Sequence, residues 1–185
     1  MELPKIDTSR LLLRGFVPED APLVQKLAGD KDVAFNALNI PYPFPAESAA
    51  VWISTHKKEF AQHKSAIFAI ETTSNQEFIG AVGLTTISEI NNTAEMGYWL
   101  GKSYWNKGFA SEAIAALIIF GFEEYKLNKI FATHLKRNAA SGKVLMKNGF
   151  QVEGILRQHI KHFGKYEDLV HLGLLRQEYQ DLHEF

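Results

Sequence analysis

EMGYWLGKSYWNKGFASEA, residues 95–113, is the stretch that decides the fold of this 185-residue chain. Residues 93–100 follow the turn-forming pair Asn91–Asn92 and predict a strand, and a glycine-containing loop follows over residues 101–108. The apolar run from residue 110 to about residue 125 reaches almost all round a helix, which indicates burial against a sheet. A strand therefore passes through a loop directly into a helix, whose first turn has backbone N–H groups without intrahelical partners.

Those N–H groups carry the positive end of the helix dipole, so the loop is a candidate site for a phosphate or pyrophosphate. The loop reads Asn106-Lys107-Gly108-Phe109-Ala110, and small residues at positions 108 and 110 let an anion approach the backbone. Glycine beside a helix start is also common in proteins that bind no anion, and an exposed lysine is usually only solvated. The sequence contains no GxxxxGK[ST] and no GxGxxG after a first strand, which excludes the P-loop and dinucleotide motifs.

Working outward toward the N-terminus, residues 9–16 (SRLLLRGF) predict a strand. Pro18 and the two acidic residues after it predict the start of a helix that ends near Gly29. Residues 40–45 (IPYPFP) are neither regular helix nor central strand, because proline lacks a backbone donor. A second helix is predicted over residues 47–63.

The remaining elements alternate between strand and helix patterns. Further strands are predicted over residues 66–71, 78–84, 129–135, 151–157 and 168–175, and a helix over residues 138–148 that Gly149 ends. Short connections among the strands predicted over residues 66–71, 78–84 and 93–100 indicate an antiparallel meander. The sequence therefore predicts a single domain over residues 1–185 of mixed α+β class.

Composition limits the chemistry that this domain can perform. Hydrophobic residues make up 46% and charged residues 22%, enough for a full core, and there is no cysteine. A thiolate nucleophile, a cysteine zinc site and a disulfide are therefore excluded. The net charge of −1 does not predict direct nucleic-acid binding, although lysines cluster between residues 126 and 165. The N-terminus has no signal-peptide core, and the most hydrophobic run, residues 113–122, is too short to span a membrane. We expect a cytoplasmic protein without a membrane partner.

The loop frame from Trp105 to Ala110 resembles the acetyl-CoA-binding motif Q/R-x-x-G-x-G/A of the GNAT superfamily of N-acetyltransferases. Trp105 stands where Arg or Gln is usual. The sequence pattern GYWLxxxYWxKGxAxEA resembles that of the branch of ribosomal-protein N-terminal (alanine/serine) acetyltransferases. Three other segments resemble the same branch in order and spacing: TSRLLLRGFVPEDA (8–21), RNAASGKVLMKNGFQVEG (137–154) and GKYEDLVHLGLL (164–175). The resemblance covers nearly the whole chain.

The resemblance implies a mostly antiparallel central sheet, flanked by helices, that splays open beside the strand 93–100. Acetyl-CoA would lie in the gap, with its pantetheine paired to the strand and its pyrophosphate on the loop. The implied cofactor-binding residues are Tyr98, Trp99, Leu100, Asn106, Lys107, Gly108, Phe109, Ala110, Ser111 and Asn138. From the residues alone, Asn138 is also a good helix N-cap with Ser141 three positions later.

The absence of cysteine predicts direct transfer of acetyl to an amine, without a covalent cysteine intermediate. An amine with a pKa of about 8–10 must first lose its proton. Glu95 is the candidate that binds the ammonium and relays this proton, although a solvated strand glutamate is an equal alternative. A backbone N–H near residues 99–100 is the candidate oxyanion donor. Ser141 is the candidate donor to the leaving thiolate; Tyr104 and Tyr166 are alternatives, and His134 is a weaker candidate for the base.

The resemblance favours a protein N-terminal amine as the acceptor. A small polycation, such as a polyamine or an aminoglycoside, is the first alternative, and a non-catalytic acyl-CoA-binding module is the second. Strong acidity in the acceptor pocket would favour a polycation, and an open groove would favour a peptide. Residues 35–44 are expected to shape this pocket. No spacing of His, Asp and Glu resembles a metal site, so no metal is expected. The resemblance is compatible with a homodimer.

Overall fold

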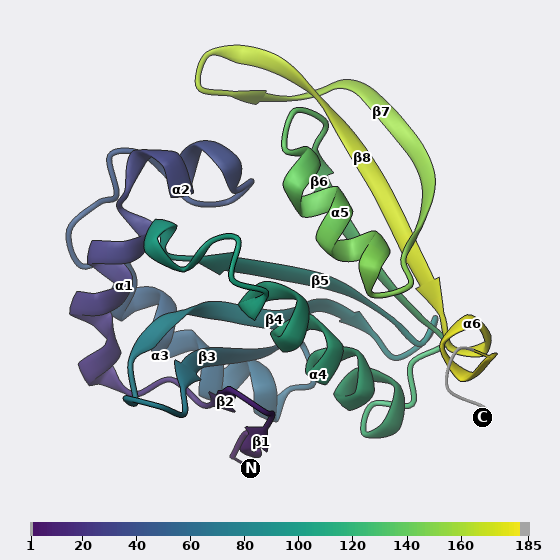
Figure 1. The fold of residues 1–185 in the computed structure, drawn as a ribbon, viewed down its shortest axis with the longest axis horizontal. Helices are drawn as coiled ribbons and strands as arrows, with labels where there is room; N and C mark the ends of the chain where they lie inside the picture. The colour runs from purple at the N-terminus through teal and green to yellow at the C-terminus, as the bar shows by residue number, and fades with distance from the viewer. Residues whose placement is uncertain (1, 182–185) are drawn as a thin grey trace.

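A computed structural model describes residues 2–181, which form one eight-stranded sheet with helices on both faces (Figure 1). The spatial order of the strands is β1-β2-β3-β4-β5-β6-β8-β7. Every neighbouring pair is antiparallel except β5 and β6, which are parallel. The strands are β1 (Ile6–Asp7), β2 (Leu11–Arg14), β3 (Ala66–Thr72), β4 (Phe78–Ser88), β5 (Thr93–Leu100), β6 (Lys129–Leu135), β7 (Gln151–His162) and β8 (Lys165–Leu175).

The helices divide between the two faces of the sheet. α4 and α5 lie on one face, and α1 and α3 lie on the other (Figure 1). The helical segments are η1 (Pro18–Asp20), α1 (Ala21–Ala28), α2 (Lys31–Asn36), α3 (Ser48–Ala61), η2 (Lys102–Tyr104), α4 (Phe109–Glu123), α5 (Ala139–Lys147) and α6 (Arg176–Asp181). None of the helices within residues 2–181 is long and apolar enough to cross a membrane.

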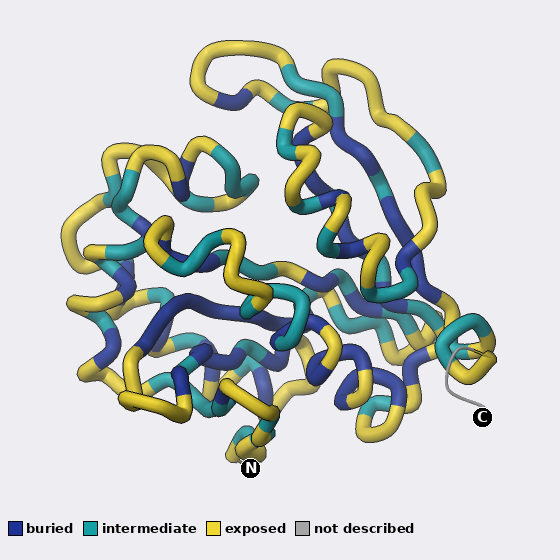
Figure 2. Tube along the Cα trace, viewed as in Figure 1, coloured by how far each residue is buried: buried dark blue, intermediate teal, exposed yellow. Residues whose placement is uncertain are grey.

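The core consists of two clusters, one for each group of helices. The larger cluster packs α4 residues such as Ile114 and Leu117 against the sheet, and the smaller one packs Val24 of α1 and Ile53 of α3. Figure 2 shows this burial along the inner strands. Successive residues of β5 alternate between the faces. The α4 side therefore receives Met96, Tyr98 and Leu100, while Trp99 packs against the smaller cluster.

The sheet opens between β5 and β6. These strands are paired only at Thr93↔Lys129, Ala94↔Ile130 and Glu95↔Phe131. Beyond this point β6 continues to pair with β8 along its whole length, while Met96 to Leu100 have no strand on that side. The predicted splayed, mostly antiparallel sheet is confirmed.

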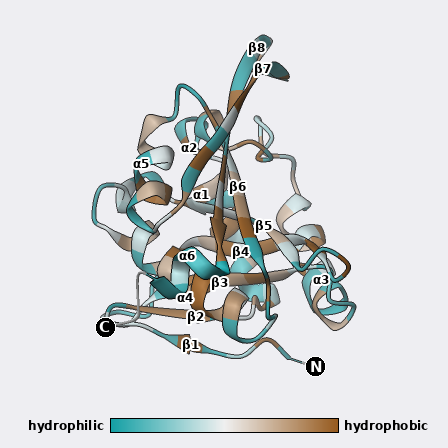
Figure 3. Cartoon of the chain, turned by 90° about the vertical axis from the view of Figure 1, so that its right-hand side faces the viewer, coloured by the Kyte–Doolittle hydropathy of each residue, from teal (hydrophilic) through white to brown (hydrophobic). Residues whose placement is uncertain are grey.

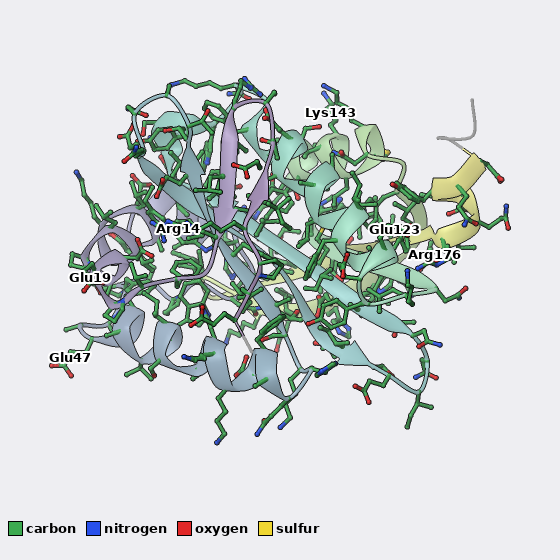
Figure 4. All side chains as sticks on the ribbon, turned by 90° about the horizontal axis from the view of Figure 1, so that it is seen from below. Arg14, Glu19, Glu47, Glu123, Lys143 and Arg176 are labelled. Carbon is green, nitrogen blue, oxygen red and sulfur yellow. The ribbon has the colours of Figure 1, made fainter. Side chains whose placement is uncertain are left out.

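Two ion-pair networks tie the outer elements to the sheet. Arg14 of β2 lies 2.8 Å from both Asp20 and Glu71, and the hydrogen bond that its guanidinium donates to Asp20 raises the pKa of Arg14 despite its burial. At the other end Arg176 lies 3.8 Å from Glu123, and the two are neighbours in Figure 4.

The β7–β8 hairpin is longer than the predicted strands 151–157 and 168–175. Its strands continue to residue 162 and begin again at residue 165, joined by Phe163 and Gly164, whose φ angles are 47° and 80°. The tip is hydrophilic (Figure 3), so it carries no alternation of apolar residues that would have marked it as strand. The helices α2 and α6 and the short strand β1 were not predicted either. α2 had a local signal, because the Asp30 side chain caps it at Asp32 N and Val33 N.

Candidate active site

The opening between β5 and β6 forms a cleft of ≈ 840 Å³. Its walls come from β5, the loop before α4, the end of β6, α5 and residues 36–40. All of the predicted site residues except Lys107 line this cleft. The ammonium of Lys107 instead lies 5.7 Å from the centre of the Tyr104 ring.

The loop before α4 presents free backbone donors to the cleft. Asn106 and Gly108 adopt left-handed φ angles of 59° and 81°, which turn the chain into the helix. The first backbone bond of α4 runs from Glu112 N to Gly108 O, at 3.1 Å. Within the described residues, the N–H groups at positions 109–111 donate no hydrogen bond. This geometry suits a bound anion.

The N-terminal segment holds this loop in place through the carboxylate of Glu112. That carboxylate accepts hydrogen bonds from Thr8 Oγ1 (2.7 Å), Ser9 Oγ (3.0 Å) and Arg10 Nε (2.7 Å). Burial pushes the pKa of Glu112 up, but these hydrogen bonds outweigh it and hold the pKa below its ordinary value. Arg10 also donates to the carbonyl of Lys107 at 3.0 Å. Sequence reasoning missed Arg10 and Glu112 as loop anchors.

Trp105 fixes the other side of the loop. Its indole N–H donates to the carbonyl of Leu100, at 2.8 Å, and so joins the loop to the end of β5. The departure from Arg or Gln at this position therefore has a structural role in this chain.

Ser141 and Tyr98 meet across the cleft. The Tyr98 hydroxyl of β5 lies 2.8 Å from the Ser141 hydroxyl of α5. Burial raises the pKa of Tyr98, so this phenol keeps its proton and remains a donor. Asn138 caps α5, because its Oδ1 accepts from Ser141 N at 3.2 Å and its Nδ2 donates to Asn36 O at 3.1 Å. The predicted N-cap role of Asn138 is confirmed.

Glu95 lies where the sheet divides, as the last residue of β5 that is paired with β6. By the alternation of the strand it belongs to the face of Trp99, opposite the face of Tyr98. Its carboxylate makes no hydrogen bond or ion pair with any described residue. It is also the single carboxylate among the described residues that line the cleft.

Among the other candidates for proton transfer, His134 and Tyr104 line the cleft but already form hydrogen bonds, and Tyr166 lies outside it. His134 is buried, with Nδ1 2.8 Å from Leu135 O, and a Cβ added at Gly142 would lie 2.8 Å from its Nε2. The Tyr104 hydroxyl donates to Glu77, and burial together with this bond raises its pKa to about 12. Tyr166 is 68% exposed on the β7–β8 hairpin and does not line the cleft.

A clasp around Arg137 holds α2 against the β7–β8 hairpin. The guanidinium lies 3.6 Å from the centre of the Phe35 ring and donates to Phe35 O at 2.5 Å. It also pairs with Glu167 at 2.9 Å. His162 adds a contact from Nε2 to Phe35 O at 3.1 Å. The clasp fixes the wall formed by residues 36–40, and the sequence carried no local signal for it.

No group of three or more His, Cys, Asp or Glu side chains within residues 2–181 is arranged to hold a metal ion.

A sheet that divides after a short parallel seam, with free helix N-terminal donors at the opening, places the protein among the acetyltransferases. The family described as Acetyltransferase (GNAT) domain matches residues 10–151, and the chain belongs to this family. The resemblance stated from the sequence is therefore confirmed, and so is the N-acetyltransferase activity as a class.

One sequence relative and two solved structures illustrate these similarities, and the two structures are of acetyltransferases with different acceptors. The N-acetyltransferase p20 of Bacillus licheniformis is 36% identical over 172 residues, which cover 93% of this chain and 96% of p20. The structure of RimL, a ribosomal L7/L12 alpha-N-protein acetyltransferase in complex with coenzyme A, has a TM-score of 0.86 at 22% identity, covering 93% of this chain and 98% of RimL. The spermidine N-acetyltransferase of Vibrio cholerae, in complex with CoA and spermine, has a TM-score of 0.82 at 22% identity, covering 94% and 99%. At these identities the two structures show the fold alone.

Proposed function

We propose that this protein transfers the acetyl group of acetyl-CoA to the N-terminal amine of a protein. The observation that carries this proposal is the position of Glu95. It is the single carboxylate lining the cleft, and it lies at the division of the sheet, on the face opposite Tyr98. One ammonium can reach this carboxylate from one face while the thioester approaches from the other.

The cofactor side of the cleft fits acetyl-CoA. The β5 edge over Tyr98, Trp99 and Leu100 has no strand beside it and is free to pair with the amide groups of pantetheine. The free N–H groups at the start of α4 suit the pyrophosphate. Lys143 and Lys147 also line the cleft and are exposed, so they add positive charge for the phosphates.

In the proposed reaction Glu95 binds the acceptor ammonium and takes its proton, directly or through water. The free amine attacks the thioester carbonyl, so that a C–N bond forms and the C–S bond breaks, and the second proton of the attacking nitrogen leaves with the thiolate as CoA thiol. A backbone N–H near Trp99 and Leu100 stabilises the oxyanion between these events. Ser141 donates a hydrogen bond to the departing thiolate, and the Tyr98 hydroxyl donates to Ser141 in turn.

The charges around the cleft favour a protein N-terminus over a polyamine or an aminoglycoside. A polycation needs several carboxylates to balance its charges, and the described residues of the cleft offer only Glu95. The cations Arg137, Lys143 and Lys147 line the same cleft. We also place this reaction in the cytoplasm, where protein synthesis supplies new N-termini.

The test is release of CoA thiol from acetyl-CoA with three classes of acceptor: N-terminal peptides, spermidine and an aminoglycoside. We expect saturable release with peptides, together with a mass gain of roughly 42 Da, the mass added when acetyl replaces an amine hydrogen. Saturation by spermidine at lower concentration than by any peptide would overturn the choice of acceptor. Tight acetyl-CoA binding without release for any amine would instead indicate a binding module.

A further inference from the structure

A second groove of ≈ 570 Å³ lies beside the cleft. It is lined by residues 38–42 and residues 161–163, and it shares the segment 38–40 with the cleft as a common wall. The rings of Tyr42 and Phe163 stack within it, with 6.0 Å between their centres. Both side chains are more than 40% exposed, so the groove offers an aromatic surface to a ligand.

The hairpin tip that borders this groove is strongly basic. Residues 155–166 read ILRQHIKHFGKY and contain Arg157, Lys161 and Lys165 but no acidic residue. None of these three cations forms an ion pair with a described residue, whereas the next acidic residues, Glu167 and Asp168, are paired with Arg137 and Lys136. In a chain of net charge −1 this positive charge is local. Figures 2 and 3 show the tip to be exposed and hydrophilic.

Contacts of Phe35 hold the groove and the cleft next to each other. Phe35 of α2 packs edge-on against Phe163, with 5.4 Å between the ring centres, and its carbonyl is bound by Arg137 and His162. These contacts join α2, the segment before α5 and the β7–β8 hairpin. A chain that leaves the cleft over the wall at residues 38–40 therefore meets the groove next.

We propose that this groove binds the acceptor polypeptide just beyond its N-terminal amine and selects acceptors with carboxylates there. The inference rests on the proposed function, because it places the amine at Glu95. Lys161, which lines the groove, and Lys165, which pairs with His162 across the hairpin, supply the positive charge, and the stacked rings of Tyr42 and Phe163 supply apolar surface. A peptide fits better than RNA, because the groove shares its wall with the cleft and the whole chain lacks a basic excess.

The experiment compares three peptides that share their first two residues and carry glutamates, glutamines or lysines at the next positions. In the wild type we expect KM to rise from the glutamate to the glutamine to the lysine peptide. The double variant Lys161→Glu/Lys165→Glu should raise KM for the glutamate peptide roughly tenfold, lower it for the lysine peptide and leave kcat unchanged. The difference should shrink in high salt.

Lys64→Glu is the matched control, because Lys64 is exposed in the turn after α3 and lines neither the cleft nor the groove. It should leave all three KM values unchanged. Equal KM values for the three peptides in the wild type, or an equal change for all three in the double variant, would overturn the inference. Loss of binding to a single-stranded RNA oligonucleotide, with unchanged KM for the glutamate peptide, would assign the surface to nucleic acid and also overturn it. Acetylation of spermidine but of no peptide would reject the proposed function itself.

Discussion

The two faces of the sheet at its division are built in different ways. On the α4 face, the strand, the loop and the helix that form the proposed cofactor side come from one continuous stretch, residues 93–123. The proposed acceptor side is assembled from residues 33–42, Arg137 and the tip of the β7–β8 hairpin. The first depends on backbone geometry, and the second depends on side chains brought together from distant segments. Substitutions on the two faces should therefore affect different quantities.

The largest effect is expected on the α4 face. Gly108→Trp should raise the acetyl-CoA dissociation constant by roughly 100-fold or more, equivalent to about 2.7 kcal/mol, because the indole would cover the free N–H groups. Gly108 also has a φ of 81°, and a Cβ there would lie 3.3 Å from Arg10 Nη2. Gly108→Ala is the control, since it shares the strain without the bulk. Calorimetric titration measures both, and wild-type affinity in a folded Gly108→Trp protein would reject the loop as the pyrophosphate site.

Glu95→Gln should affect the acceptor side alone. The amide cannot take a proton, so kcat should fall by roughly 100-fold while acetyl-CoA affinity stays the same. The pH profile of kcat should also change. Glu89→Gln, at an exposed position of the same chemistry, serves as the control. If Glu95→Gln kept the wild-type rate and pH profile, the proton would have to leave by another route.

Tyr98 and Ser141 both belong to the α4 face, beside the division of the sheet, so their substitutions test the chemistry of that face. Tyr98→Phe should lower kcat by about tenfold, because Ser141 loses the donor that orients it. The double variant with Ser141→Ala should be no slower than Ser141→Ala alone, since the two hydroxyls act in one chain. Purely additive losses would show that Tyr98 acts independently of Ser141.

The smallest effect concerns stability on the α1–α3 face. His56 of α3 is 4% exposed, and both of its ring nitrogens lack a hydrogen-bond partner among the described residues. Burial lowers the pKa of His56 to about 4. The pKa in the folded state is therefore below that in the unfolded state, so the stability present above about pH 6.5 is lost as pH falls toward 4. At pH 5.5 the loss should be about 1 kcal/mol.

Urea unfolding of the wild type and of His56→Leu at pH 7.5 and pH 5.5 checks this. The variant should lose less stability between the two pH values than the wild type does. Parallel losses would mean that His56 is not the group responsible. Acetyl-CoA affinity should be unaffected, since His56 does not line the cleft.

The same contrast explains how much the sequence could predict. The cofactor side was predictable, because a strand, a glycine loop and an apolar helix are local patterns, and β5 was predicted with its observed ends. For the proposed acceptor side the sequence indicated only the segment 35–44, because the contact of Arg137 with Phe35 joins residues about a hundred positions apart and leaves no periodic signal. The strand segments at the hairpin tip were also missed, because they lack the apolar alternation that marks a strand. The turn that joins them, at Phe163–Gly164, is set by the backbone angles of these two residues.

The bonds from Thr8, Ser9 and Arg10 to Glu112 have a consequence for the order in which the chain is assembled. They join residues 102–104 positions apart, so the segment 8–10 cannot dock until the start of α4 has been synthesised. The β1–β2 edge of the sheet and the loop before α4 therefore become ordered together. A polypeptide fused ahead of residue 8 is attached directly beside the loop anchor, whereas one fused after residue 181 follows α6, and the second arrangement leaves the anchor undisturbed.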